Sequence, residues 1–568
     1  MSVEEKNEKE VRVGIFVCHC GSNIGGLINC KELVKYVKKL PNVAYAEDNL
    51  YTCSEIGLSS IKKAIKEYDL NRVVVAACTP RTHEPLFREC ILEAGLNPYL
   101  FNFVNIRDQC TWVHMKYPKE AFEKAIDLIA MGVAKATKLE PLEMITIDVT
   151  PTALIIGGGI SGMSAALNLS RQGFKTYLVE KENELGGRLN LLYKLFPYDT
   201  EASELIEDIK NKVQNAPNLE VHKPARVKSI EGFVGNYEIE IEQNDNIINL
   251  TVGVIIVAVG ASLFTPFKFF EYDGKLRITQ YELESKLKNN EVDANNIVMI
   301  QCVGSRIDER PYCSSVCCMT ALKNALIIKD KNPGANVTIL FRDLYTPGTN
   351  YEKYYRTARE KGIIFIKYDL DKLPSIEENL IKVFNEYMGD YIIIPYDLLV
   401  LSTPLVANDD NKELAQLLKV PLGANGFFLE AHVKLRPNDF ATDGIYIGGS
   451  AKWPVDITEA ITQGYAAASR ASTILSHKEI QVEGAIATVD SEMCIGCGAC
   501  EMICPYNAIQ IERTEKGLKS TIISAVCKGC GVCGASCPLN AISIKHFKDP
   551  QIFEQIYAIS KGLLEKGV

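Results

Sequence analysis

The sequence contains no apolar run long enough to span a membrane. Its longest apolar stretches, Val252–Ala261 and Tyr391–Ala407, are either short or interrupted by Asp397 and two prolines. A membrane-spanning helix needs about 20 apolar residues. The first twelve residues, Met1–Arg12, are charged and lack the apolar stretch of a secretory signal. We therefore expect a cytoplasmic protein with no membrane partner.

A surplus of basic residues is also absent. The chain has 62 Lys and Arg residues against 71 Asp and Glu residues, which gives a formal net charge of −9. A nucleic-acid-binding surface depends on clustered positive charge, so we expect no nucleic-acid partner. With 568 residues, 47% of them hydrophobic, the chain is long enough to form several globular domains.

Cysteine, in contrast, is abundant, with 19 residues in the chain. Because a cytoplasm keeps thiols reduced, this abundance indicates metal or redox chemistry rather than disulfides. Two C-terminal runs have the bacterial ferredoxin spacing, in which three cysteines of one run and the last cysteine of the other bind each [4Fe–4S] cube. A structural zinc is the alternative, and two runs that each end in Cys-Pro argue against it. The spacing predicts one cube at Cys494, Cys497, Cys500 and Cys537, and the other at Cys527, Cys530, Cys533 and Cys504.

Residues 152–180 predict a dinucleotide-binding turn. An apolar strand leads into a glycine-rich turn of the form G-x-G-x-x-G, a helix rich in Ala and Leu follows, and a second strand ends at Glu180. The glycines allow a pyrophosphate to approach the helix N-terminus, and the acidic residue is placed for a ribose hydroxyl. The dinucleotide contacts expected here are Gly157, Gly159, Ile160, Ser161, Gly162, Glu180 and Lys181.

Three later segments resemble motifs of flavoproteins with two dinucleotide-binding domains, the group that includes thioredoxin and glutathione reductases. These segments are Gly186-Gly187-Arg188, a strand that ends at Ala258-Val-Gly260, and Gly448-Gly449-Ser450 ahead of a helix from Ile457 to Ile474. The resemblance implies that the dinucleotide is FAD, with its flavin near the start of that helix. The further FAD contacts that it implies are Gly187, Arg188, Ala258, Gly260, Gly449, Ser450 and Ile457.

Such reductases contain an inserted NAD(P)H domain, which corresponds here to residues 291–395. The first strand of this insert, Ile297–Gln301, is not followed by a glycine-rich loop; four cysteines spaced Cys-x10-Cys-x3-Cys-Cys occupy that turn instead. A pyrophosphate has no cradle in such a turn, whereas four thiolates suit a cluster. Buried or disulfide-linked thiols are the alternative. We predict a third [4Fe–4S] cluster at Cys302, Cys313, Cys317 and Cys318.

The N-terminal 147 residues contain seven more cysteines in the pattern of a small α/β domain. Several of these cysteines follow expected strands, and strand C-terminal ends converge on one crevice in an α/β unit. Cys18 should point to the opposite face of its strand, while Cys30 and Cys90 should lie in the core. Buried thiols of an ordinary core are the alternative to a metal site. We predict a fourth cluster at Cys20, Cys53, Cys78 and Cys110.

Over nearly the whole chain these motifs resemble the A subunits of the heterodisulfide reductase family. No cysteine lies between residues 111 and 301, so the ferredoxin module inserted in larger methanogen members is absent. The resemblance implies flavin-based electron bifurcation, in which an electron pair is divided between ferredoxin and a disulfide-reducing partner. The partners that it implies, in methanogenesis or a related process, are proteins similar to the B and C subunits of heterodisulfide reductase, the small electron-transfer subunit of a hydrogenase or formate dehydrogenase, and ferredoxin, around a homodimer.

The expected fold is α/β: a thioredoxin-reductase-like core with two dinucleotide-binding domains, an N-terminal α/β domain and a C-terminal α+β ferredoxin domain of the 2[4Fe–4S] type. We expect no catalytic side chain beyond the FAD and the clusters. An NAD(P)H-linked flavin:ferredoxin oxidoreductase and an electron-relay scaffold with a structural flavin are the alternative functions. The expected boundaries are 1–147 for the N-terminal domain, 148–290 and 396–480 for the FAD domain, 291–395 for the degenerate nucleotide domain, 485–548 for the ferredoxin domain and 549–568 for a C-terminal helix.

Overall fold

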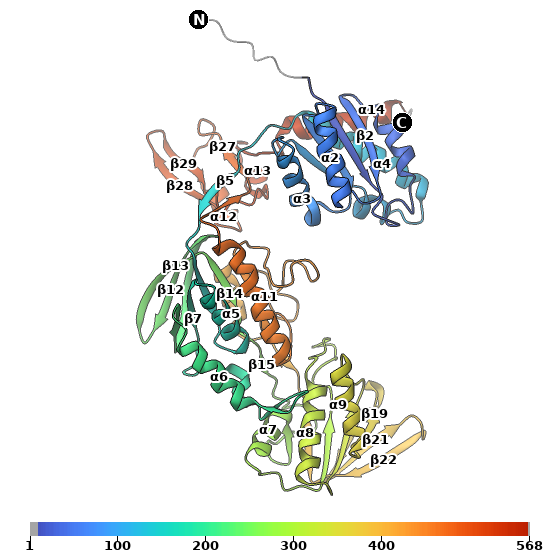
Figure 1. The fold of residues 1–568 in the computed structure, drawn as a ribbon, viewed down its shortest axis with the longest axis vertical. Coiled ribbons are helices and arrows are strands. Elements are labelled where there is room, and N and C mark those ends of the chain that lie inside the picture. The colour runs from blue at the N-terminus through green and yellow to red at the C-terminus, as the bar shows by residue number, and fades with distance from the viewer. Residues whose placement is uncertain (1–9, 566–568) are drawn as a thin grey trace, which may run out of the picture. The chain divides into compact units, whose positions relative to one another are not determined.

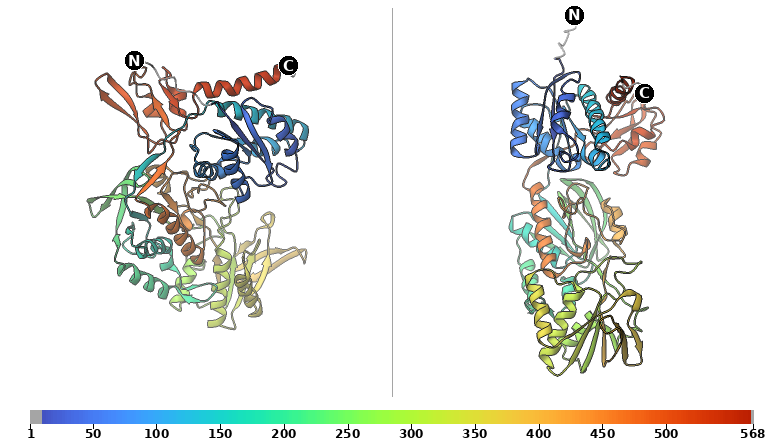
Figure 2. Two further views of the ribbon diagram at one scale, coloured as in Figure 1. Left: turned by 45° about the horizontal axis from the view of Figure 1, so that its top comes forward. Right: turned by 90° about the vertical axis from the view of Figure 1, so that its right-hand side faces the viewer.

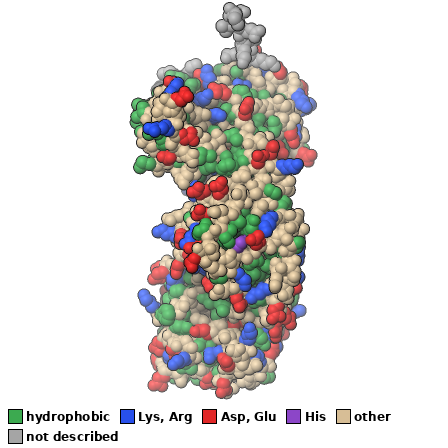
Figure 3. Space-filling view, turned by 90° about the vertical axis from the view of Figure 1, so that its left-hand side faces the viewer, with side chains coloured by type: hydrophobic (Ala, Val, Ile, Leu, Met, Phe, Trp, Pro, Cys, Tyr) green, Lys and Arg blue, Asp and Glu red, His purple; other side chains and the backbone are tan. Residues whose placement is uncertain are grey.

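The computed structural model describes residues 10–565, which form two compact units (Figure 1). The first unit comprises the residues up to Thr146 and those from Gln481 onward, and the second comprises Ile147–Ile480. The expectation that the first twelve residues contain no secretory signal falls almost entirely outside the described residues. Within the described part of the chain, no helix is long and apolar enough to cross a membrane. On the face drawn in Figure 3, acidic and basic side chains are interspersed.

The N-terminal part of the first unit is a parallel four-stranded sheet with the spatial order β2-β1-β3-β4. Its strands are β1 (Val13–Cys18), β2 (Val43–Asn49), β3 (Arg72–Ala77) and β4 (Phe101–Asn105). The helices are α1 (Cys30–Val37), α2 (Glu55–Glu67), α3 (Pro80–Glu93), the π-helical turn η1 (Arg107–Thr111) and α4 (Pro118–Thr137). The two central strands are almost entirely apolar and buried, as is typical of a parallel sheet that is covered on both faces.

The C-terminal part of the first unit repeats one motif twice, as its two cysteine runs predict. Its strands are β27 (Ala487–Val489), β28 (Ile509–Thr514), β29 (Gly517–Ile522) and β30 (Ile542–Ile544), and its short helices are α12 (Ala499–Ile503) and α13 (Val532–Ser536). The final helix, α14 (Asp549–Glu565), packs along α4 of the N-terminal part (Figure 2).

Specific contacts join these two parts of the first unit. Arg88 forms an ion pair with Glu483 (Nη1–Oε2 2.7 Å), and its guanidinium lies over the ring of Tyr99. His546 donates from Nε2 to the backbone carbonyl oxygen of Tyr99 (2.6 Å), and burial lowers the pKa of His546 to about 4. Segments that are far apart in the sequence therefore form one compact unit.

The second unit is built on a parallel five-stranded sheet of order β10-β7-β6-β14-β25. These strands are β6 (Thr152–Ile156), β7 (Lys175–Val179), β10 (Leu219–His222), β14 (Val254–Val257) and β25 (Ile445–Ile447). Helix α5 (Ile160–Arg171) packs against α11 (Ile457–Leu475), and α6 (Ala202–Gln214) packs against α5 (Figure 1). An antiparallel sheet follows, made of β11 (Ala225–Phe233), β12 (Asn236–Gln243) and β13 (Asn246–Val252).

The inserted part has a parallel sheet of its own, with the order β16-β23-β17-β18-β19. Its strands are β16 (Arg277–Thr279), β17 (Asn296–Ile300), β18 (Asn336–Phe341), β19 (Ile364–Lys367) and β23 (Leu398–Leu401). Its helices are α7 (Gln280–Lys288), α8 (Cys317–Lys331) and α9 (Thr349–Glu360), and a small antiparallel sheet contains β20 (Ser375–Glu377), β21 (Leu380–Asn385) and β22 (Asp390–Pro395). This sheet extends beyond residues 291–395 on both sides. The fold is thus α/β: the second unit contains two parallel five-stranded sheets, and the C-terminal part of the first unit, called the ferredoxin part below for its two cysteine runs, contains antiparallel strand pairs.

Candidate flavin and iron–sulfur sites

The turn after β6 has the backbone geometry of a phosphate-binding loop. Gly157 has a φ of 107°, which favours glycine, and the backbone N–H of Gly158 donates to Oε2 of Glu180 (2.6 Å) at the end of β7. A Cβ on Gly162 would lie 1.9 Å from the carbonyl oxygen of Gly157, so a larger residue would push α5 away from the strand. The free N–H groups at the start of α5 therefore face this turn, where an anion is favoured.

A buried hydroxyl without a partner lies beside this turn. Ser161 is 6% exposed, yet its Oγ has no hydrogen-bond partner among residues 10–565. Gly448, after β25, approaches so closely that a Cβ there would lie 3.0 Å from Ser161 Oγ. Because buried polar groups are nearly always hydrogen-bonded, we expect an atom of a bound ligand to be the hydrogen-bond partner of this hydroxyl. These residues fit the pyrophosphate of a dinucleotide at the start of α5.

The other expected FAD residues lie around the same edge of the sheet. Arg188, in the short helix η2 (Gly187–Leu191), donates from Nη2 to Ser450 Oγ (2.8 Å), so the structure brings two distant motifs together. Lys181 instead directs its ammonium to Asp410 (2.7 Å). The remaining expected positions lie at the ends of β14 and β25 or at the starts of η2, α5 and α11: Gly187, Ala258, Gly260, Gly449, Gly159, Ile160 and Ile457.

A pocket at the start of α11 is lined by both the FAD part and the inserted part of the second unit. Its lining includes Arg188 and Ile457 from the first, and Val316, Thr320 and Lys323 from the second. Helix α8, which begins with two of the expected cluster ligands, contributes the last two of these residues. The inserted part therefore reaches the place where the flavin end of FAD is expected.

A buried ion pair adjoins this pocket. Lys323 is 1% exposed and hydrogen-bonds to the fully buried carboxylate of Glu284. Its ammonium also donates to the backbone carbonyl oxygen of Lys194 (2.8 Å), while the second oxygen of Glu284 accepts the backbone N–H of Tyr193 (2.8 Å). Burial lowers the pKa of Lys323, and Glu284 opposes this effect. Neither charged residue is among those expected from the sequence.

The four cysteines of the inserted part are neighbours at one end of its sheet. Cys302 follows β17, Cys313 lies in the connection, and Cys317 and Cys318 begin α8. Burial raises the pKa of Cys302 to about 11; Cys318 and Cys313 add to this, and Arg306 opposes it. The mutual influence of the thiols places them next to one another, at the turn where a nucleotide-binding loop would begin. Four adjacent thiols fit a cluster and offer no cradle for a pyrophosphate.

The N-terminal cysteines group differently from the expectation. The backbone N–H of Cys20 donates to Cys18 Sγ (3.3 Å). Burial raises the pKa of Cys78 to about 11; Arg107 opposes this, and Cys20, Cys18 and Cys53 add to it. Burial and the Cys18 and Cys20 thiols also raise the pKa of Cys53. The structure therefore brings together Cys18, Cys20, Cys53 and Cys78.

Cys110 does not belong to this group. It is fully buried on η1, and its Sγ lies 3.1 Å from the carbonyl oxygen of Ala121 on α4. Cys18 takes its place because β1 and β3 are adjacent and Val17 pairs with Ala76, so the strand ends that carry Cys18 and Cys78 are neighbours. The backbone N–H groups of Cys20 (3.3 Å) and Thr52 (3.4 Å) donate to Cys18 Sγ. The expected orientation of Cys18 is thus wrong. Cys30 and Cys90 are buried, as expected.

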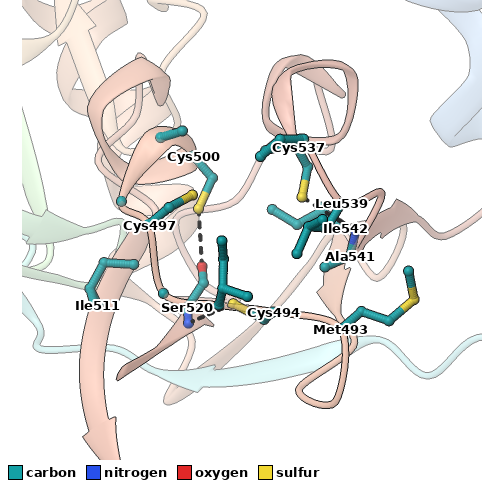
Figure 4. Close-up of a pocket in the computed structure, with 15 residues that line it drawn as sticks. Met493, Cys494, Cys497, Cys500, Ile511, Ser520, Cys537, Leu539, Ala541 and Ile542 are labelled. Carbon is teal, nitrogen blue, oxygen red and sulfur yellow. Dashed lines mark hydrogen bonds between the residues drawn. The ribbon is translucent and has the colours of Figure 1, made fainter. Parts of the chain in front are cut away.

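The ferredoxin part has two hollows, each lined by four thiols. One is lined by Cys494, Cys497, Cys500 and Cys537, whose sulfurs point into the same space (Figure 4), and the other by Cys504, Cys527, Cys530 and Cys533. Each hollow takes one cysteine from the other run. Backbone N–H groups donate to these thiols, for example Ser520 to Cys494 Sγ (3.4 Å) and Ala541 to Cys537 Sγ (3.3 Å).

Each hollow is lined by four cysteine thiols, the number of thiolates that a [4Fe–4S] cube takes, one on each iron.

Comparison with known proteins agrees with this reading of the two parts. A family model described as a 4Fe-4S dicluster domain matches residues 487–544, and one described as a pyridine nucleotide-disulphide oxidoreductase matches residues 151–300. The chain therefore uses [4Fe–4S] clusters and FAD as cofactors. Among solved structures, T. acidophilum thioredoxin reductase aligns with a TM-score of 0.40 and 18% identity, covering 57% of this chain and 99% of that one.

Relatives of known name match almost the full length. The second iron-sulfur A subunit of CoB--CoM heterodisulfide reductase in Methanopyrus kandleri is 39% identical over 97% of this chain and 98% of its own. The A subunit of H(2):CoB-CoM heterodisulfide,ferredoxin reductase in Methanothermobacter thermautotrophicus is 36% identical over 90% and 93%. The A subunit of H(2)/formate:CoB-CoM heterodisulfide,ferredoxin reductase in Methanococcus maripaludis is 35% identical over 89% and 91%. With such identity across nearly the whole of both chains, this oxidoreductase chain belongs to the family of heterodisulfide reductase A subunits.

Proposed function

We propose that this chain is the flavin-based electron-bifurcating subunit of a heterodisulfide-reductase-type complex. In this role it receives electron pairs from a hydrogenase- or formate-dehydrogenase-type donor and divides them between ferredoxin and a disulfide-reducing partner similar to the B and C subunits. The names of two relatives, which combine H2 or formate with CoB-CoM heterodisulfide and ferredoxin, support this role. Bound FAD supplies the exchange between a two-electron donor and one-electron clusters.

The geometry of α8 is the observation that carries the proposal. The helix begins with Cys317 and Cys318, and its residues Thr320 and Lys323 line the pocket at the start of α11. With a rise of about 1.5 Å per residue, the step from Cys318 to Lys323 is about 7–8 Å along the helix axis. One rigid element therefore connects the cysteine site with the flavin side of the FAD site.

The residues of this pocket have distinct tasks in that arrangement. Arg188 is held by Ser450 (2.8 Å) and by the Tyr281 hydroxyl (3.5 Å), so its guanidinium is fixed beside the pocket. Apolar side chains such as Val316 and Val455 line the same space and exclude water. A lysine ammonium has three donors. Lys323 makes two such bonds among the described residues, to Lys194 and to Glu284, and we assign its third donor to a bound group.

The proposal includes a fourth cluster, and we assign its ligands as Cys18, Cys20, Cys53 and Cys78 in place of the set that contains Cys110. With one FAD and four [4Fe–4S] cubes, the purified chain should contain about 16 iron atoms. The Cys78→Ala variant should lose about four of these irons and keep its FAD, whereas the matched Cys110→Ala variant should keep all of them. An unchanged iron content in Cys78→Ala would favour buried thiols of an ordinary core.

Electron transfer through the inserted part is tested with Cys313→Ala. This variant should keep its FAD and both ferredoxin clusters and should lose electron flow from the flavin to ferredoxin, because one ligand of the connecting cluster is missing. The flavin is reduced anaerobically through the donor complex, and ferredoxin reduction is followed spectroscopically. If this variant reduces ferredoxin at the wild-type rate, the cluster is not on the electron-transfer pathway. If NADH bleaches the flavin absorbance of the isolated wild-type chain, the chain is better described as an NAD(P)H-linked flavin:ferredoxin oxidoreductase.

A further inference from the structure

Arg107 brings a positive charge to the N-terminal thiols. It is the first residue of η1, directly after β4, and its Nη1 donates to Cys20 Sγ at 3.5 Å. This contact joins the guanidinium directly to one of the four thiols of the group.

The position of Arg107 is fixed by its neighbours. Its Nε donates to Asp108 Oδ1 (2.8 Å), and its guanidinium lies 4.6 Å from the centre of the Trp112 ring. The side chain of Asn105 accepts the backbone N–H groups of Arg107 (3.1 Å) and Asp108 (2.9 Å), which fixes the start of η1. The Arg107 side chain is only 19% exposed. Since a guanidinium is planar and rigid, the edge that Asp108 leaves free is directed at the sulfur.

We propose that Arg107 is a positioning residue that raises the reduction potential of the [4Fe–4S] cluster held by Cys18, Cys20, Cys53 and Cys78. The proposal rests on the fourth cluster assigned above. Reduction adds one electron, and hence one negative charge, to the cube and its thiolates. A charge-assisted N–H···S bond stabilises that extra charge, and hydrogen bonds to cluster sulfurs are among the main determinants of cluster potential.

The other two kinds of cluster site provide contrast and control. In the ferredoxin part, the donors to Cys494 and Cys537 described above are neutral backbone amides. In the inserted part, Arg306 forms an ion pair with Asp343 (2.7 Å) and opposes the rise in the pKa of Cys302 that burial causes. An Arg–Asp pair thus adjoins the thiols in each of the two sites outside the ferredoxin part. Replacing Arg306 by Met removes the same charge from the second unit and is the control for Arg107→Met.

The test is an anaerobic redox titration of the full chain, followed by electron paramagnetic resonance. The signal of the N-terminal cluster is the one that is missing from Cys78→Ala. In Arg107→Met, the equilibrium constant for reducing this cluster should fall about tenfold or more, which is about 59 mV for a one-electron couple. Arg107→Lys keeps the charge but not the rigid fork, so its potential should lie between the two. Arg306→Met should leave this signal at the wild-type potential.

Iron analysis separates the two ways in which this idea can fail. If Cys78→Ala has as much iron as the wild type, the fourth cluster itself is absent and the proposed cofactor content is wrong. If the cluster is present and titrates at the wild-type potential in Arg107→Met, or if Arg306→Met shifts it equally, the role of Arg107 is overturned. If Arg107→Met loses its cluster, the reduction potential of the cluster in Arg107→Lys is the test instead. A wild-type potential in Arg107→Lys would then overturn the proposal.

Discussion

Replacing Lys323 by Met tests the buried ion pair beside the flavin-side pocket. Met has a similar length and no charge, so the substitution removes the ammonium while keeping most of the packing. The carboxylate of Glu284, which has no solvent-exposed surface, would lose its only positively charged partner among the described residues. Its second oxygen would still accept the backbone N–H of Tyr193 (2.8 Å), so the carboxylate would be partly hydrogen-bonded but uncompensated in charge.

The size of the effect follows from this burial. Removing one member of a buried pair costs about 3–5 kcal/mol, because a charge is left without a partner in the interior. For a domain of a few hundred residues, about 1 kcal/mol lowers the melting temperature by about 2–4 °C. The Lys323→Met variant should therefore release its FAD about 6–20 °C below the wild type.

The release is followed by flavin fluorescence during heating, which reports on the second unit alone. In the double variant Lys323→Met/Glu284→Gln no buried charge remains, and the amide oxygen can still accept the Tyr193 N–H, so at least half of the loss should be recovered. As a control, Lys212→Met removes an exposed pair with Asp208 in the same unit and should change little, since exposed pairs contribute little to stability. A shift below about 3 °C in the single variant, or no recovery in the double variant, would refute the reasoning.

Three further outcomes can be measured. Gly162→Ala should lower the amount of FAD bound per chain, measured by flavin absorbance, because its Cβ would lie 1.9 Å from Gly157 O. The pKa of His546 is lowered from 6.5 to about 4, because the folded protein buries the neutral ring. The folded state is therefore fully stable above pH 6.5 and loses up to about 3 kcal/mol of its free energy of unfolding as the pH falls to about 4. His546→Gln should reduce this loss of stability at acid pH, measured by unfolding experiments. Cys504→Ala should disturb the resonance signal of the cluster bound by the other cysteine run, and a defect confined to its own run would contradict the crossed arrangement.

The motifs that are compact in the sequence were predictable from it. Three ligands of each cube follow from the fixed spacing within one run, and the fourth follows from the Cys-Pro pair that ends the other run. The dinucleotide turn follows from the glycines at 157, 159 and 162, whose backbone requirements do not depend on the rest of the fold. Both constraints lie in motifs that a sequence displays in full: one strand–turn–helix–strand segment for the dinucleotide turn, and two copies of one cysteine run for the cubes.

The N-terminal thiols could not be grouped from local pattern alone. Whether Cys18 or Cys110 approaches Cys78 depends on which strands are adjacent, and the order β2-β1-β3-β4 is a property of the whole sheet. The direction of Cys110 depends on η1, a π-helical turn that no pattern in residues 107–111 indicates. An explicit assignment of strand order would have placed β1 beside β3, and with them Cys18 beside Cys78.

The buried ion pair of Lys323 and Glu284 was not predicted from the sequence, for a different reason. Lys323 lies in a helix of mixed composition, and Glu284 lies in another helix 39 residues earlier. Charged residues are almost never fully buried unless they are paired. From the sequence alone, Lys323 and Glu284 are therefore both expected at the surface until their pairing is known. The pairing arises only when α7 and α8 pack against each other.

The joining of the two chain ends has a consequence for biosynthesis. The N-terminal sheet is made first, but several of its neighbours are made last: the ring of Phe547 lies 3.9 Å from the Lys135 ammonium, and α14 covers α4. At about 5–20 residues per second, a ribosome needs on the order of 20–70 s to make the second unit in between. Throughout that interval the face of α4 is uncovered and available to chaperones or to aggregation. A late premature stop codon that removes α14 would therefore damage the part of the protein that was synthesised first.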